Sequence, residues 1–81
     1  MSDQAAMHRH LHAAVKARLD IVADHALRDR DAAAHLEALK AAATKLGSLV
    51  ANLPRDTDPM LRHYLERQSY TKALDWLQDH P

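Results

Sequence analysis

Apolar residues recur at steps of three and four across the middle of the chain. They form an unbroken seam over two and a half heptads: Leu36, Leu39, Ala43, Leu46, Val50 and Leu53. This spacing makes one side of an α-helix apolar and suits antiparallel packing in a bundle. Only seven residues are Val, Ile or Thr, and no stretch alternates apolar and polar residues over strand length. The sequence therefore predicts an all-α fold, a small antiparallel helical bundle.

Caps and prolines divide the chain into three predicted helices. A first apolar stripe ends at the basic Arg28 and Arg30, and Asp31 then stands where an N-cap is expected. Pro54 ends the second helix, and the Asp58-Pro59 pair is typical of the start of a third. We predict one domain over residues 1–81, with helices at about 4–28, 32–53 and 59–79 and frayed ends at 1–3 and 80–81.

Gly47 lies inside the second predicted helix, where glycine costs about 1 kcal/mol relative to alanine. Either the helix frays after Leu46, or a neighbouring helix crosses closely at the glycine. We favour the close crossing, because the apolar seam continues beyond it to Leu53.

The third predicted helix has apolar residues on two sides. Leu61 and Leu65 share one side, whereas Tyr70 and Leu77 lie nearly opposite. Either the helix breaks near Gln68/Ser69, with Ser69 capping a new helix, or a continuous helix turns its second side to a partner. We favour the break.

The aromatic C-terminal segment is the predicted partner-binding surface. Its residues are Tyr70, Leu74, Trp76 and Leu77. Sixteen of the hydrophobic residues are Ala, so one chain has a thin core, and self-association would bury more apolar area. The alternative is that these four residues fold back and complete the core of a single chain.

The histidines provide a second hypothesis. On a helix, His8 and His12 lie one turn apart on the same side, which is a spacing that can chelate a divalent metal. Antiparallel packing would bring His63 near them as a third ligand. No fourth ligand is evident, so adventitious zinc or nickel is expected rather than a resident cofactor. The sequence has no HExxH motif.

Composition narrows the remaining functions. Eleven Lys and Arg balance 11 Asp and Glu, and there is no Cys. The balance disfavours nucleic acid as a partner, and the lack of thiols excludes disulfides and thiolate chemistry. No apolar run approaches the roughly 18–20 residues of a membrane span, and we expect a cytoplasmic protein. With so few large side chains, a pocket of about 300 Å³ for a small-molecule substrate is hard to enclose, and we expect no enzymatic activity.

The function predicted from the sequence is therefore a non-enzymatic interaction or accessory protein that uses apolar helix faces, as a homodimer or with another protein. A metal-binding protein is the first alternative. A DNA-binding helix-turn-helix formed by residues 61–66 and 70–78 is the second. Together with Asp79, which directly follows it, its reading helix would carry one Lys against two Asp, a poor match to a polyanion.

Overall fold

The computed structural model describes residues 3–80, and it places five helices along them. These are α1 (Asp3–Val22), α2 (His25–Arg30), α3 (Ala32–Ala51), α4 (Pro59–Glu66) and α5 (Tyr70–Asp79). No strand occurs within the described range. The predicted all-α class is confirmed, whereas the predicted count of three helices is wrong.

The first predicted helix divides because Asp24 caps a helix of its own. α1 ends at Val22, and the Asp24 carboxylate accepts a hydrogen bond of 3.0 Å from the backbone N–H of Leu27. An aspartate that bonds the backbone in this way favours a helix start over a helix interior. The predicted range 4–28 is therefore wrong at its C-terminal end.

Three other predicted boundaries are confirmed. Asp31 accepts from Ala34 N at 3.0 Å, and Asp58 accepts from Met60 N at 2.9 Å with Pro59 in the first turn of α4. The chain also breaks at Gln68, which has a φ of 58°. Ser69 occupies the N-cap position of α5, although its side chain makes no capping hydrogen bond.

The predicted frayed ends are tested only in part. Asp3 already belongs to α1, and His80 follows the last residue of α5. Residues 1–2 and 81 lie outside the described residues.

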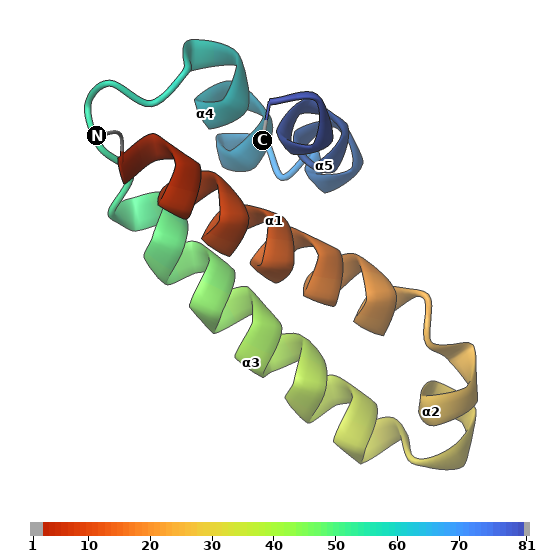
Figure 1. Ribbon diagram of the computed structural model, residues 1–81. Helices are drawn as coiled ribbons and strands as arrows, with labels where there is room; N and C mark the ends of the chain where they lie inside the picture. The colour runs from red at the N-terminus through yellow and green to blue at the C-terminus, as the bar shows by residue number, and fades with distance from the viewer. Residues whose placement is uncertain (1–2, 81) are drawn as a thin grey trace.

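α1 is the central helix. It pairs with α3 in an antiparallel hairpin whose tip is α2, and α4 and α5 lie over the N-terminal half of α1 (Figure 1). α5 runs antiparallel to α1, since His8 contacts His80 at one end and Arg18 lies over the Tyr70 ring at the other. The molecule is elongated, 44 × 23 × 22 Å.

The core lies entirely where α4 and α5 cover the hairpin. The buried apolar side chains are Leu11, Ala14, Val15, Leu46, Leu61, Leu65, Ala73 and Leu77. Between Lys16 and Lys45, by contrast, His35 is the only buried residue. We call residues 16–45 the open half and the rest of the described chain the covered half.

The buried side of α3 is rotated relative to the predicted seam. Leu46 is buried as expected, but Leu36 is 50% exposed and its neighbour His35 is buried instead. The inward residues follow a second series with the same three- and four-residue steps: His35, Leu39, Ala42, Leu46, Leu49 and Leu53. The predicted seam therefore holds for only part of its length.

The close crossing predicted at Gly47 is also wrong. A Cβ atom placed on Gly47 would meet no atom within 4 Å, and the residue is exposed. α3 continues through it to Ala51, so the fraying alternative does not hold either.

Candidate functional site

The four residues predicted to bind a partner pack against the core of their own chain. Leu77 is 3% exposed, and Tyr70, Leu74 and Trp76 are partly buried against the core cluster. The break at Gln68 allows this, because it turns α5 back along α1. The arrangement matches the alternative in which these residues complete the core of a single chain.

Trp76 joins the start of α1 to the end of α5 through two histidines. The His80 ring stacks on the indole at 3.9 Å between centroids, and the His8 ring meets it edge-on at 5.3 Å. His8 Nδ1 lies 2.9 Å from the carbonyl oxygen of His80. Because a carbonyl only accepts, Nδ1 donates this hydrogen bond, and the buried His8 Nε2 has no partner within the described chain. The contact fixes the orientation of His8.

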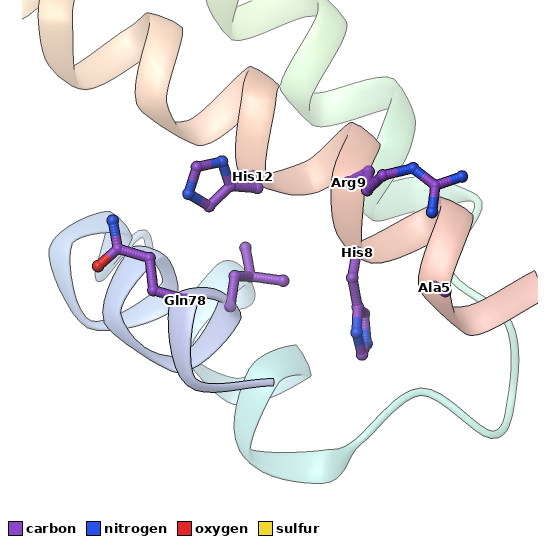
Figure 2. A pocket seen from close by; sticks show the side chains of 6 residues that line it. Ala5, His8, Arg9, His12 and Gln78 are labelled. Atoms are coloured by element: carbon purple, nitrogen blue, oxygen red, sulfur yellow. The ribbon is translucent and has the colours of Figure 1, made fainter. Parts of the chain in front are cut away.

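A cleft of about 490 Å³ lies beside this cluster, between α1 and α5. It is lined by Ala5, His8, Arg9, His12, Leu77 and Gln78. His12 and Gln78 stand on opposite walls, while the exposed Arg9 side chain lies at the rim and points away from Gln78 (Figure 2). The volume exceeds the roughly 300 Å³ at which small-molecule pockets begin, but the cleft is open to solvent and is not an enclosed pocket.

His63 does not join His8 and His12. It is absent from the residues that line the cleft, and it is exposed on α4. Leu61 and Leu65 point into the core, and a residue two positions from each lies on the opposite side of the helix. Among residues 3–80, no three His, Asp or Glu side chains gather as a metal would require. The arrangement therefore gives the metal alternative no support.

The outer side of α5 has little positive charge. Thr71, Lys72, Asp75 and Asp79 are exposed there, which gives one Lys against two Asp, and Gln78 lies toward the cleft. A helix entering the major groove needs basic or neutral polar side chains toward the phosphates. This face does not favour the DNA-binding alternative.

The open half has a different surface, with large apolar side chains in water. Val22 and Leu36 are each 50% exposed and Leu39 is only partly buried, whereas Leu19 packs against the core at the boundary with the covered half. Met60, at 51%, is the corresponding exposed residue of the covered half. Scattered apolar residues are normal on a surface, but here they coincide with a stretch that has no buried apolar residue.

His35 is the residue of this region that sequence reasoning missed. Its Nε2 donates to the carbonyl oxygen of Ile21 at 2.8 Å, across from α3 to the last turn of α1. The Ile21 carbonyl also accepts from the backbone N–H of Asp24 at 3.1 Å, and the His35 donor adds a second hydrogen bond that ties α3 to the last turn of α1. The sequence did contain a signal for its burial, because the second series of residues at steps of three and four on α3 begins at His35.

No helix among the described residues is long and apolar enough to cross a membrane. Comparison with protein-family models, with curated proteins and with solved structures found no match.

Proposed function

We propose that this chain is a non-enzymatic interaction protein that forms a homodimer through the open half of its α1–α3 hairpin. The observation that carries the proposal is the burial of one histidine, and of no apolar side chain, between Lys16 and Lys45. Two helices alone cannot cover their own apolar stripes, and Val22 and Leu36 remain half in water.

A second copy of the same chain suits this surface. The open half carries six basic and five acidic residues, so two copies would meet without strong repulsion. Two hairpins packed face to face make a four-helix bundle, which closes under twofold symmetry. The exposed Ala43 of α3 lies two turns from Leu36 on the same side of the helix, so it lets a facing helix approach closely.

The surface is large enough for a stable contact. A specific dimer buries about 800 Å² on each partner. The whole chain exposes 5593 Å², and the open half is a segment of 30 residues that is almost all accessible.

The cleft between α1 and α5 gives little support for catalysis. Neither a hydroxyl nor a carboxylate is among its lining side chains, so it lacks the usual oxygen nucleophile and the acid–base carboxylate pair. Association through the exposed apolar residues of the open half is therefore better supported than catalysis in the cleft.

Sedimentation equilibrium provides the test, with a matched pair of variants. Leu36→Glu places a charge in the proposed interface, whereas Met60→Glu changes an equally exposed residue outside it. We expect the parent to be a dimer at micromolar concentrations, and Leu36→Glu to weaken dimerisation at least about tenfold, which corresponds to about 1.4 kcal/mol. Met60→Glu should leave the dimer unchanged. A parent that stays monomeric at every concentration, or equal effects of the two variants, would contradict the proposal.

A further inference from the structure

We propose that the α1–α5 cleft binds a small organic anion, with the negative group held by Arg9, His12 and Gln78. This inference does not depend on dimerisation. It gives a role to the His8-Arg9-His10-Leu11-His12 segment, which lies outside the open half and takes no part in the proposed dimerisation.

The charge of the cleft favours an anion over a metal cation. Arg9 brings a permanent positive charge to the rim, and no Asp or Glu lines the cleft to neutralise it. A guanidinium beside a divalent cation would repel it, whereas beside a carboxylate or phosphate it forms charge-assisted hydrogen bonds. His8 and His12 have the spacing of a metal-binding pair, but Arg9 lines the same cleft. Its positive charge therefore makes an anion, and not a metal cation, the expected ligand.

The side chains of the cleft divide into a fixed wall and free donors. His8 already donates to the His80 carbonyl and packs against Trp76, so it is held in place. Across the cleft, His12 and Gln78 face each other from the two helices (Figure 2). Arg9 is exposed and long enough to rotate from the rim over a ligand.

The rest of the lining indicates the body of the ligand. Leu77 and Ala5 are apolar, and the volume of about 490 Å³ lies within the roughly 300–1,000 Å³ of small-molecule sites. We therefore infer a ligand with one anionic group, a carboxylate or a phosphate, attached to a small apolar or aromatic body.

The test is a titration of the full-length chain with three probes at constant ionic strength: phenyl phosphate, benzoate and inorganic phosphate. Amide chemical shifts locate the site, and fluorescence gives a second reading because Trp76 is the only tryptophan and lies 5.3 Å from the His8 ring. We expect saturable shifts around His12 and Gln78 for phenyl phosphate, for benzoate or for both. Inorganic phosphate, which has no apolar body, should bind more weakly.

Variants within one segment provide the controls. Arg9→Gln should weaken binding about tenfold, because it removes the positive charge, and His12→Leu should weaken it severalfold, because it removes the ring N–H donor. His10→Leu should change binding less than about twofold, since His10 is exposed and lies outside this cleft. Retained amide spectra would show that the variants are folded.

Three outcomes would overturn the proposal. One is a linear response that does not saturate with any probe. Another is binding that survives both Arg9→Gln and His12→Leu. The third is Zn²⁺ alone giving saturable shifts at the cleft when no anion does, which would restore the metal alternative.

Discussion

The two halves of the α1–α3 hairpin have similar apolar residues but very different burial. On α1, Val15 is fully buried and Val22 is 50% exposed; on α3, Leu46 is 1% exposed and Leu36 is 50% exposed. Each pair shares a residue type and a helix. What differs is the presence of α4 and α5, which cover only the first member of each pair. Periodicity thus sets which side of a helix is apolar, and the number of neighbouring helices sets how much of that side leaves water.

The comparison implies that stability is unevenly distributed. Full burial of a Leu or Val side chain is worth about 1.5–3 kcal/mol, and a half-exposed one retains only part of that. All eight residues of the apolar core lie outside the open half. In a single chain, the open half is therefore held by its link to the covered half and by few contacts of its own.

The largest expected effect comes from truncating the matched leucines of α3. Leu46→Ala should cost about 2–5 kcal/mol, because it removes transfer free energy and leaves a cavity among packed neighbours. Leu36→Ala should cost less than about 1 kcal/mol in the monomer, because water already reaches the side chain. Urea denaturation followed by circular dichroism measures both, at protein concentrations low enough to exclude association.

The same pair also separates folding from association. If Leu36→Ala proves as costly as Leu46→Ala at high dilution, the open half is packed within one chain and the comparison fails. If its cost rises with protein concentration while that of Leu46→Ala stays constant, Leu36 contributes to a contact between chains.

Local signals made much of the fold predictable. The N-caps at Asp31 and Asp58 and the break at Gln68 depend on a few neighbouring residues, and each was predicted from them. Asp24 was missed although it too acts locally, because it also fits a surface pair with Arg28 one turn later on a continuous helix.

The side of α3 that faces inward could not be predicted in the same way. Two series with steps of three and four run along this helix, one through Leu36 and one through His35, and they share Leu39, Leu46 and Leu53. His35 faces inward and contacts the Ile21 carbonyl of another helix, which the spacing along one helix does not reveal. The candidate site is limited by tertiary packing in the same way. The spacing placed His8 and His12 on one side of α1, and both line the cleft. The residues that face them come from α5, and their identity depends on how that helix turns back along α1.

A smaller effect is expected from His35, the one buried residue of the open half. His35→Leu substitutes an apolar side chain of similar size and removes the donor to the Ile21 carbonyl. We expect a loss of about 0.5–1.5 kcal/mol, the net contribution of one hydrogen bond, because the Ile21 carbonyl still accepts from the backbone N–H of Asp24. Faster hydrogen exchange at the junction of α1 and α2 should accompany it, and urea denaturation gives the total.

His25→Leu is the matched control for that change. His25 is exposed at the start of α2, so its replacement should alter stability by no more than about 0.5 kcal/mol. Equal effects of the two variants would mean that the Ile21 contact does not hold the open half together.

The smallest expected effect tests whether anything covers the outer side of α3. Gly47→Ala adds a Cβ that meets no atom within 4 Å, so packing within the chain neither opposes nor favours it. We expect a gain of about 0.5–1 kcal/mol, because alanine loses less backbone entropy on entering a helix. Ala43→Gly, also at an exposed position of α3, should lose a similar amount. Thermal denaturation at low concentration measures both. A Gly47→Ala variant that loses stability only at concentrations where the chain dimerises would mean that a helix of the second copy packs over this side, so that the contact between chains extends from the open half into the covered half.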